Sequence, residues 1–334
     1  MSTRIAINGF GRIGRCVTRI ALNTEDVQLV AVNDLGSPEQ LVHLFEYDSV
    51  HGTYDGDIRL EGDTMHVDGD EVKMLAVADP SELPWDEMDV DVVLESTGVF
   101  RKRDDAAKHL AAGADKVVIS APGKGVDLSM CMGINHGDLT PEMEIVDVAS
   151  CTTNCLAPVA KALNDAFGIE QGLMTTVHAY TNNQNVLDTP HGKDFRRARA
   201  AAVNMIPTTT GAAVAVTRVL PELEGKLNGM AIRVPTPNVS CVDLVVKLNA
   251  DVGTDEVNEA LKAASEGELE GILGYSDKPL VSTDYVGNPH SSIVDAQSTM
   301  DVGGGFVKVL SWYDNEWGFS HRMIDAVKHI ANVD

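Results

Sequence analysis

Residues 3–15 read TRIAINGFGRIGR, and this stretch decides the fold of the first part of the chain. The apolar run that ends at residue 8 is typical of a short buried strand, and apolar residues recur at helical spacing from residue 15 to residue 22. Between them stand Gly9, Gly11 and Gly14 in the pattern G-x-G-x-x-G. Such glycines allow a tight turn, a close backbone approach to a pyrophosphate and close packing of helix on strand. The stretch therefore predicts a strand–turn–helix unit of the kind that binds dinucleotides.

An acidic residue stands where such a unit needs one. A second strand is expected over residues 28–33, and Asp34 follows it, 20 residues after Gly14. At this distance a carboxylate can accept hydrogen bonds from the ribose hydroxyls of an adenosine. The glycines alone are also typical of a turn that binds nothing, but the strand, the helix and the acid together favour a dinucleotide site.

Strands and helices continue to alternate through the first 150 residues. We expect a helix at 41–45, hairpins within 56–75, a strand at 90–95, a helix at 104–112 and a strand at 116–119. This alternation predicts an α/β fold with a doubly wound parallel sheet of the Rossmann type. Small residues at 96–98 and 120–123 follow the later strands, at the edge where such sheets bind ligands, although either cluster alone is typical of an ordinary turn.

The stretch SCTTNC, residues 150–155, is the second chemical signal. An apolar run leads into it and a helical pattern leads out, so Cys151 is predicted at the start of a helix. The free N–H groups and positive dipole end of a helix favour anions, and we expect them to lower the pKa of the thiol and hold it as a thiolate. A buried cysteine that acts as a small hydrophobe is the alternative. Because the neighbours are hydroxyls and an amide, we predict a reactive Cys151 and a structural Cys155.

The pattern changes after Cys151. Strand-like runs at 173–180, 239–248 and 306–313 have no regular helix between each pair, although two helical stretches interrupt the region. This predicts a second, α+β domain built on a mixed or antiparallel sheet. We assign residues 1–150 to a dinucleotide-binding domain and 151–318 to a catalytic domain, with a final helix, 319–334, packing back on the first domain.

Composition limits the function classes. The 334 residues carry 50 Asp and Glu against 26 Lys and Arg, a net charge of −24, which argues against nucleic acid because a phosphate backbone requires a basic face. The acidic residues are scattered, which argues against a disordered acidic tail. Their mutual repulsion predicts stability and activity that rise as salt screens it, and a salt-rich cytosol, that of a halophile, is the simplest habitat. An ordinary acidic enzyme is the alternative.

Membrane, metal and disulfide signals are weak. No run approaches the ~20 apolar residues that a membrane span needs, and the start of the chain is typical of a strand rather than of a secretion signal. The five cysteines show neither metal spacing nor a disulfide framework. We therefore expect a cytoplasmic protein with no metal and no membrane partner.

Several stretches, in the order in which they occur, resemble phosphorylating glyceraldehyde-3-phosphate dehydrogenases over essentially the whole chain. They are NGFGRIGR at 8–15, ASCTTN at 149–154, VHAYT at 177–181, RRAR at 196–199, PTTTGA at 207–212, RVPT at 233–236 and WYDNEWG at 312–318. The resemblance implies a Cys151 thiol that attacks the aldehyde of glyceraldehyde 3-phosphate and a His178 imidazole that acts as the base. A hydride then passes to NAD, and phosphate releases 1,3-bisphosphoglycerate from the thioester, a step of glycolysis and gluconeogenesis. Without the resemblance, His178 could be a hydrogen-bonded histidine of a sheet.

The resemblance also implies residues for the anions. Thr181, Thr210, Gly211 and Arg233 would hold the phosphate of the substrate, and Ser150, Thr152 and Arg197 would serve the two phosphate sites near the thiol. Arginine forks, hydroxyls and backbone amides are the usual phosphate donors. On its own, Arg233 could equally belong to a surface ion pair, and Arg196 and Arg199 could be interface residues.

For the cofactor, the resemblance implies contacts along the whole dinucleotide. Arg12 and Ile13 would contact the pyrophosphate, and Asp34 would contact the ribose. Thr97 and Ser120 would contact the dinucleotide further along its length, and Asn315 would contact the nicotinamide carboxamide. The chain departs from many bacterial members at Ala78, where they carry an arginine on the adenine side. The family is a homotetramer in which a long polar loop, here 181–207, reaches a neighbouring subunit's cofactor site.

The residues after Asp34 bear on which nicotinamide cofactor is used. The charge of Asp34 would repel a 2′-phosphate, Leu35 offers it no hydroxyl, and Pro190 matches the NAD-type pattern of the family. Gly36 and Ser37 could give room and a donor. We expect NAD to be preferred, with NADP possible. Erythrose-4-phosphate dehydrogenase, which shares these motifs, and a catalytically silent NAD-binding regulatory protein remain alternatives.

Overall fold

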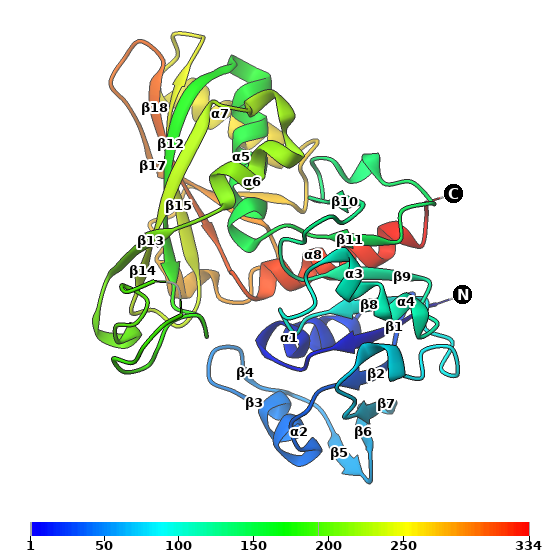
Figure 1. Ribbon diagram of the computed structural model, residues 1–334. Coiled ribbons are helices and arrows are strands. Elements are labelled where there is room, and N and C mark those ends of the chain that lie inside the picture. Colours follow the sequence, from blue (N-terminus) through cyan, green and yellow to red (C-terminus); the bar gives the residue numbers. More distant parts are fainter. Residues whose placement is uncertain (1, 193, 334) are drawn as a thin grey trace. The chain divides into compact units, whose positions relative to one another are not determined.

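The computed structural model describes residues 2–192 and 194–333 (Figure 1). Contacts divide the chain into two units. Unit 1 comprises Met1–Met132, His136–Ala149 and Ser320–Asp334, and unit 2 comprises Gly133–Asn135 and Ser150–Phe319. The chain therefore leaves unit 1 for most of unit 2 and returns to it at the end.

Unit 1 is built on a nine-stranded sheet with the strand order β10-β11-β9-β8-β1-β2-β7-β6-β5. The strands are β1 Thr3–Asn8, β2 Val27–Asn33, β5 Ile58–Glu61, β6 Thr64–Val67, β7 Asp70–Leu75, β8 Val92–Glu95, β9 Lys116–Ile119, β10 Leu128–Ser129 and β11 Ile145–Asp147. Those from β10 to β7 pair in parallel, which confirms the predicted Rossmann-type sheet. The hairpins expected within 56–75 extend this sheet, because β6 and β5 add to β7 as antiparallel strands.

Short helices connect these strands. They are α1 Arg12–Ala21, α2 Pro38–Glu46, α3 Arg103–Ala106 and α4 Lys108–Ala111, with the 3₁₀ turns η1 Pro80–Glu82 and η2 His136–Asp138 and the small hairpin of β3 Tyr47–Asp48 and β4 Gly52–Thr53. Helix α2 starts where Ser37 accepts a hydrogen bond from the backbone N–H of Gln40 and Pro38 occupies the first turn, a usual helix start. The single helix expected over 104–112 is instead the pair α3 and α4, and nothing in the structure explains the break.

Unit 2 is built on a seven-stranded sheet with the order β13-β14-β12-β15-β18-β17-β16. Its strands are β12 Ile169–Ala179, β13 Ile206–Thr209, β14 Leu227–Val234, β15 Ser240–Leu248, β16 Leu273–Ser276, β17 Ser292–Asp301 and β18 Phe306–Tyr313. The pairs β12–β14 and β16–β17 are parallel and the other pairs are antiparallel, which confirms the predicted mixed sheet.

Three helices pack on this sheet, α5 Cys151–Phe167, α6 Ala212–Val219 and α7 Thr254–Ser265 (Figure 1). Helix α5 contacts four of the strands, and its Leu156, Val159 and Leu163 are buried, so it forms the centre of the unit. It ends at Gly168, whose φ of 69° is a left-handed conformation that glycine adopts without strain. The remaining elements are η3 Ala201–Val203, η4 Pro221–Leu223, η5 Ser282–Tyr285 and α8 Trp317–Ile330, which belongs to unit 1 from Ser320 onward.

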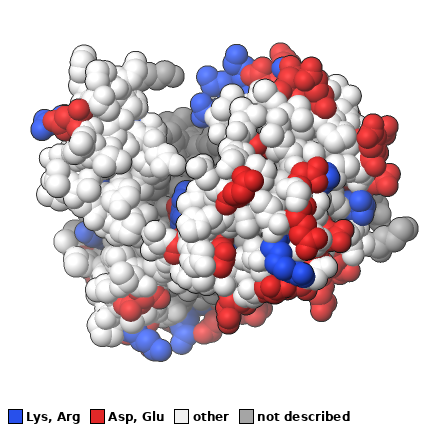
Figure 2. All heavy atoms as spheres, turned by 90° about the horizontal axis from the view of Figure 1, so that it is seen from below, with Lys and Arg blue, Asp and Glu red and all other residues white. Residues whose placement is uncertain are grey.

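The expected long polar segment, 181–207, consists mainly of turns up to η3 and β13; its residue 193 lies outside the described part. Asp and Glu side chains are spread in small groups over the face drawn in Figure 2, as their scatter along the sequence suggests. Among the residues described, no helix combines the length and the apolar character needed to cross a bilayer.

Candidate active site

Cys151 is the first residue of helix α5, as its sequence context predicts. The preceding Ser150 caps the helix by accepting a hydrogen bond from the backbone N–H of Thr153 at 3.1 Å. Ala149 has a φ of 57°, which is uncommon for a residue with a side chain. The chain thus turns sharply before the thiol and leaves it at the end of the helix where backbone N–H groups are free.

His178 stands at the end of strand β12, with its Nε2 atom 3.6 Å from the Sγ atom of Cys151. Its ring meets that of Tyr313 edge to face, with the centroids 5.9 Å apart. The Tyr313 hydroxyl lies 2.9 Å from the hydroxyls of both Thr152 and Thr176, so this ring is itself held in place. The thiol and the imidazole that sequence comparison paired are therefore neighbours in unit 2.

Arg233 lies on the other side of the imidazole. The parallel register of β12 and β14 makes it the direct partner of His178, and its Nη1 atom donates to the carbonyl of Ala179 at 3.0 Å. Two groups face the Nδ1 atom of His178: the same carbonyl at 2.7 Å, which can only accept, and the Nη1 atom of Arg233 at 2.8 Å, which can only donate. A base that acts through Nε2 requires the tautomer with its proton on Nδ1, donated to the carbonyl, so that the lone pair of Nε2 faces Cys151.

The pKa values of the pair are set mainly by burial. Burial raises the pKa of the Cys151 thiol above its ordinary value, although the charge of Arg233 and hydrogen bonds from Thr152 oppose this. Burial, followed by the charge of Arg233, lowers the pKa of His178 to about 3. The expectation of a pKa lowered by the helix start is therefore wrong, because desolvation of the sulfur outweighs the local dipoles. The resting pair is a neutral thiol beside a neutral imidazole.

Cys155 behaves as a structural residue, in agreement with the sequence. Its buried Sγ atom lies 3.4 Å from the hydroxyl of Ser292 and 3.3 Å from that of Ser311. Burial raises its pKa to about 12, so it is protonated near neutral pH. A thiol in this state is a poor nucleophile.

Asn315 is oriented by a residue that the sequence analysis missed. Ser240 accepts a hydrogen bond from the backbone N–H of Ala179 at 3.0 Å and donates one to the Oδ1 atom of Asn315 at 2.8 Å. The amide nitrogen of Asn315 is thereby directed away from Ser240. Val239, next to Ser240, has a φ of 66°, a strained conformation for a β-branched residue. The only sequence signal for Ser240 is its position shortly after the stretch RVPT.

Two guanidinium groups lie near enough to influence each other. The pKa of Arg233 is lowered mainly by burial, and the positive charge of Arg197 adds to the effect. Arg197 is held in place because its Nε atom donates to the Thr208 hydroxyl at 2.9 Å and lies 3.4 Å from the Asp194 carboxylate. A pair of cations that repel each other is an environment that stabilises an anion.

The other predicted anion residues occupy turns of unit 2. Gly211 stands at the N-terminus of α6, and Thr210 accepts a hydrogen bond from the backbone N–H of Ala212 at 3.2 Å. Thr181 is exposed, and its backbone N–H donates to the side chain of Gln184 at 2.8 Å. Arg199 pairs with Asp188 at 2.8 Å, and both are exposed.

The predicted nucleotide residues of unit 1 gather at one edge of its sheet. The glycine turn follows β1, Asp34 follows β2, Thr97 follows β8 and Ser120 follows β9, and these four strands are neighbours. Strand β1 pairs with β2 on one side and with β8 on the other, so the order of the strands reverses at β1. Ligands of such sheets bind at this switch point.

Close packing explains two of the glycines. A Cβ atom on Gly9 would lie 2.6 Å from the backbone nitrogen of Thr97, and one on Gly14 would lie 2.1 Å from the carbonyl oxygen of Gly9. Gly11 is the N-cap residue of α1, and Arg12 and Ile13 follow it as the first residues of that helix. The backbone of this turn is therefore bare of side chains where a pyrophosphate would approach it.

The acidic residue after β2 is already engaged. The carboxylate of Asp34 accepts hydrogen bonds from the backbone N–H groups of Phe10 at 2.8 Å and Gly36 at 2.9 Å, which ties it to the glycine turn. Arg12 forms an ion pair with Asp48, another residue that the sequence analysis missed. Burial acts to raise the pKa of Asp48, but bonds from Arg12 and from the backbone of His51 and Val50 lower it to about 2.

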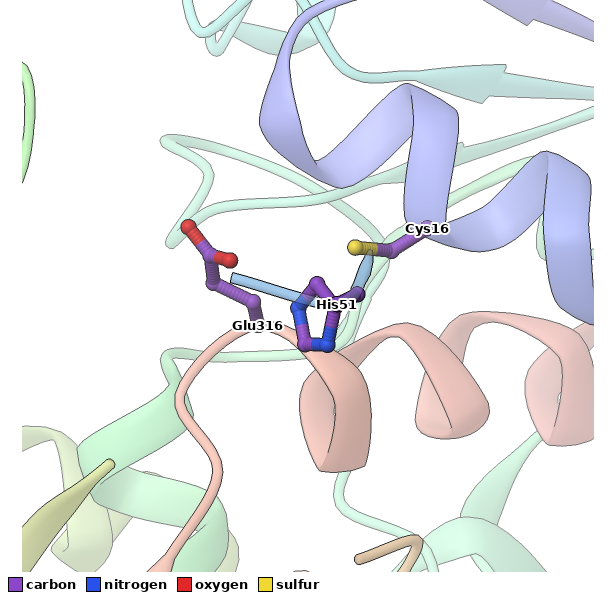
Figure 3. A group of neighbouring side chains, drawn as sticks. All are labelled: Cys16, His51 and Glu316. Atoms are coloured by element: carbon purple, nitrogen blue, oxygen red, sulfur yellow. The ribbon is translucent and has the colours of Figure 1, made fainter. Parts of the chain in front are cut away.

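Figure 3 draws Cys16 and His51 of unit 1 together with Glu316, which belongs to unit 2. Within unit 1, one thiol and one imidazole fall short of the four ligands of a structural zinc site. We assign no metal to these residues.

One unit has a parallel sheet with a bare glycine turn, and the other has a thiol beside an imidazole. These features define the class: a dinucleotide-dependent oxidoreductase. The family models for the NAD binding domain and the C-terminal domain of glyceraldehyde 3-phosphate dehydrogenase match residues 3–103 and 150–315. The chain is 59% identical to the glyceraldehyde-3-phosphate dehydrogenase of Geobacillus stearothermophilus over 333 residues, 99% of each chain. It is 58% identical to glyceraldehyde-3-phosphate dehydrogenase 1 of Bacillus subtilis (strain 168) over 332 residues, also 99% of each. The chain belongs to the glyceraldehyde-3-phosphate dehydrogenase family.

These matches also identify the chain as an enzyme that uses NAD. They do not bear out the expectation of a halophilic source. The salt dependence that follows from the charge of −24 stays a prediction.

The influence of Arg233 on the thiol gives a testable pH effect. Its charge lowers the pKa of Cys151, so Arg233→Gln should raise that pKa further and reduce the thiolate fraction at any pH below it. Iodoacetamide reacts with the thiolate, so we expect alkylation of Cys151 about 3- to 30-fold slower at about pH 8, with the rate profile moved to higher pH. Arg199→Gln, which removes an exposed arginine, is the control and should leave the profile unchanged. An unchanged profile in Arg233→Gln would contradict this role.

Proposed function

We propose that this dehydrogenase oxidises glyceraldehyde 3-phosphate with NAD and inorganic phosphate to 1,3-bisphosphoglycerate, through a thioester on Cys151. The observation that carries the proposal is the Cys151 Sγ atom at the start of α5, 3.6 Å from the Nε2 atom of His178. We propose that the dinucleotide-binding domain spans residues 1–150 and the catalytic domain 151–318, with the helix at 319–334 packed on the former.

Proton transfer by His178 explains how a neutral thiol can react. As the sulfur bonds to the aldehyde carbon, Nε2 takes the thiol proton and passes it to the carbonyl oxygen, which gives a hemithioacetal. The base then removes the proton of that hydroxyl while the C–H bond breaks, and a thioester remains on Cys151. When an oxygen of hydrogen phosphate bonds to the acyl carbon, the C–S bond breaks, the leaving thiolate takes back the proton held on Nε2, and the proton of the phosphate is released to water. The lowered pKa of His178 favours return of the proton over its uptake, so proton transfer from the thiol is expected to occur together with formation of the C–S bond.

NAD supplies the acceptor for the hydride. The residues of unit 1 fit it, because the positions of Gly9 and Gly14 leave no room for a Cβ atom and keep the turn bare. In this proposal the glycine turn and the start of α1, with Gly11, Arg12 and Ile13, would hold the pyrophosphate. Asp34 would bind the ribose, and Thr97 and Ser120 would make the remaining contacts of unit 1 with the dinucleotide. Asn315, oriented by Ser240, donates to the carboxamide of the nicotinamide.

The anions are assigned to the positive groups of unit 2. Arg233 and Arg197, whose charges repel each other, would take up phosphate between them, assisted by Thr181, Thr210 and Gly211 at the start of α6. Ser150 and Thr152, at the N-terminus of α5 beside the thiol, would provide further donors for phosphate. In a chain with a net charge of −24, such local donors must overcome a repulsive field.

We propose NAD as the preferred nucleotide, with measurable use of NADP. The carboxylate of Asp34 lies where a 2′-phosphate would be repelled, and Leu35 beside it is 69% exposed and offers no donor. The hydroxyl of Ser37 caps α2, which leaves it less free to bind a phosphate.

We propose that the protein is a homotetramer and works in the cytoplasm. Large apolar side chains are exposed on strands of the unit 2 sheet, namely Leu173 on β12, Met230 on β14, Met300 on β17 and Phe306 on β18. Leu173 and Phe306 line a hollow of about 950 Å³. Exposed apolar surface of this kind favours association with another subunit. The five cysteines are free thiols, which suits a reducing compartment.

The nucleophile and the base are tested together. Purified protein should reduce NAD continuously with glyceraldehyde 3-phosphate only when phosphate is present, because without phosphate the thioester is not released and at most about one NADH forms per Cys151. Cys151→Ser should abolish turnover, because an alcohol is hardly ionised near neutral pH, and His178→Asn should slow it by roughly 10²–10⁴-fold. Cys155→Ala is the control and should stay active. A higher kcat/KM for erythrose 4-phosphate would favour the related dehydrogenase, and an inactive protein that binds NAD would favour a regulatory role.

The cofactor preference is tested at Asp34. Asp34→Ala removes the charge that repels a 2′-phosphate, so the ratio of kcat/KM for NAD to that for NADP should fall. The measurement compares both cofactors in wild type and variant at one salt concentration, because salt screens the repulsion. A wild-type preference for NADP would defeat this assignment.

The subunit interface is tested by mass in solution. Light scattering should give four times the mass of one chain, and Leu173→Glu should reduce it, since a charge would be buried against the partner. Val281→Glu, at an exposed valine outside the strands, is the control. A wild-type monomer would contradict the proposal.

A further inference from the structure

A row of buried polar side chains lies directly beneath the nucleotide edge of unit 1. Asn33, Asn8 and Glu95 are the last residues of the neighbouring strands β2, β1 and β8, and the strand register makes Asn8 the direct partner of both others. All three are at most 4% exposed. We call these three residues the edge row. Each of them directly precedes a segment that the proposed function assigns to the cofactor.

Hydrogen bonds join the edge row into one network. The side chain of Asn33 exchanges two hydrogen bonds with the backbone of Val77, at 2.8 and 2.9 Å, and donates to the Oδ1 atom of Asn8 at 2.7 Å. Asn8 in turn donates through Nδ2 to the Oε2 atom of Glu95 at 2.6 Å. These contacts fix the orientation of both amides, because each oxygen faces a donor and each nitrogen an acceptor.

Glu95 collects donors from three directions. Beyond Asn8, its Oε1 atom accepts the backbone N–H of Thr97 at 2.8 Å and also the Thr97 hydroxyl. Its Oε2 atom lies 3.2 Å from the Nε2 atom of the buried His109. A carboxylate excluded from water is costly unless such donors surround it. This arrangement satisfies the charge, and it makes Glu95 the shared acceptor of Asn8, His109 and Thr97, whose donors an apolar side chain would leave unpaired.

Trp85 decides which nitrogen of His109 carries the proton. The indole Nε1–H of Trp85 faces the Nδ1 atom of His109 at 3.0 Å, and an indole can only donate. Nδ1 is therefore the acceptor, and the proton of the neutral ring sits on Nε2, directed at Glu95. Both rings are fully buried, so the donor to Glu95 is held rigidly from behind.

The hydrogen bonds of this network fix the position of Thr97. Its hydroxyl donates to Glu95 and accepts the backbone N–H of Val99 at 3.0 Å, so both its rotamer and the turn after β8 are set by the carboxylate. The backbone nitrogen of Thr97 also lies where a Cβ atom on Gly9 would collide with it. A shift of Thr97 would therefore reach the glycine turn as well.

We propose that Glu95, with His109 and Trp85 behind it, is a positioning residue for the cofactor: it fixes Thr97 and the glycine turn in the geometry that binds NAD. The proposal rests on the assignment of Thr97 to the cofactor site. It assigns Glu95 no contact with the nucleotide and no part in the chemistry at Cys151. The network acts by holding the binding turns in place before the ligand arrives, which lowers the ordering cost of binding.

Glu95→Gln tests this directly. A glutamine offers one acceptor oxygen where the carboxylate offers two, and its NH₂ group opposes the donors of Asn8, His109 or Thr97. We expect the Kd of NAD, measured by calorimetry on the whole protein, to rise about tenfold. The alkylation rate of Cys151 without NAD should stay at the wild-type value. Trp85→Phe keeps the packing and removes the donor to His109, so it should weaken NAD binding in the same direction by a smaller factor.

A double-mutant cycle separates positioning from general destabilisation. If Glu95 acts through Thr97, then Thr97→Val and Glu95→Gln combined should raise the Kd of NAD by less than the product of their separate effects. Asp127→Asn is the matched control, because this carboxylate of unit 1 also accepts backbone N–H groups, those of Glu144 and Ile145 at 2.9 Å, and pairs with Arg103 at 3.0 Å. Asp127 directly precedes β10, which β11 and β9 separate from β8 in the sheet. The control substitution should lower the melting temperature without changing the Kd.

Two outcomes would overturn the proposal: a Kd in Glu95→Gln equal to that of wild type, or fully multiplicative effects in the cycle. If Glu95→Gln does not fold, Trp85→Phe and its own cycle with Thr97→Val decide in the same way. The readout is NAD binding, so the result stands apart from the proposed reaction. A protein that binds NAD but fails to oxidise glyceraldehyde 3-phosphate would refute the reaction and leave this test intact.

Discussion

Strand register is the constraint on which both units depend. In unit 2, Arg233 on β14 pairs with His178 on β12, and Ser240 on β15 pairs with Tyr313 on β18. A slip of one residue would turn each of these side chains to the opposite face of the sheet. In unit 1 the same kind of row runs through Asn33, Asn8 and Glu95. Chemistry is concentrated in both units at the ends of strands because adjacent strand ends bring side chains together on a rigid base.

Burial has opposite consequences around Cys151 in unit 2 and around Glu95 in unit 1. Around Cys151 it disfavours charge: the pKa of the thiol rises and that of His178 falls. At Glu95 the carboxylate is surrounded by donors and serves as a fixed point for the backbone. The surroundings of Cys151 and His178 favour the uncharged forms of both side chains, whereas those of Glu95 hold the turn after β8 in a fixed geometry. The difference lies in how many hydrogen-bond donors face each buried group.

Much of the fold and of the candidate site could be predicted because the signals are local. The glycine turn, the acid after β2 and the helix start at Cys151 are each signalled by residues within a few positions, and the structure places them in those elements. Strands β14 and β17 received no comparable prediction, since their roles depend on partners distant in sequence. The pKa of Cys151 was predicted in the wrong direction because the helix start is visible in the sequence, while the depth of the sulfur is not.

The sequence by itself determined the class of fold and the nucleotide turn and placed Cys151 at a helix start, because turn chemistry and hydrophobic period act over short distances. His178 was singled out only through the resemblance to the family. Only the tertiary structure decided which side chains orient the residues of the two candidate sites. Ser240 orients Asn315 across 75 residues of chain, and Trp85 sets the tautomer of His109 across 24. Such pairs meet only after the sheets have formed, and nothing in the local sequence of either partner marks the other. Their hydrogen bonds and the loss of water around them are properties of the packed chain.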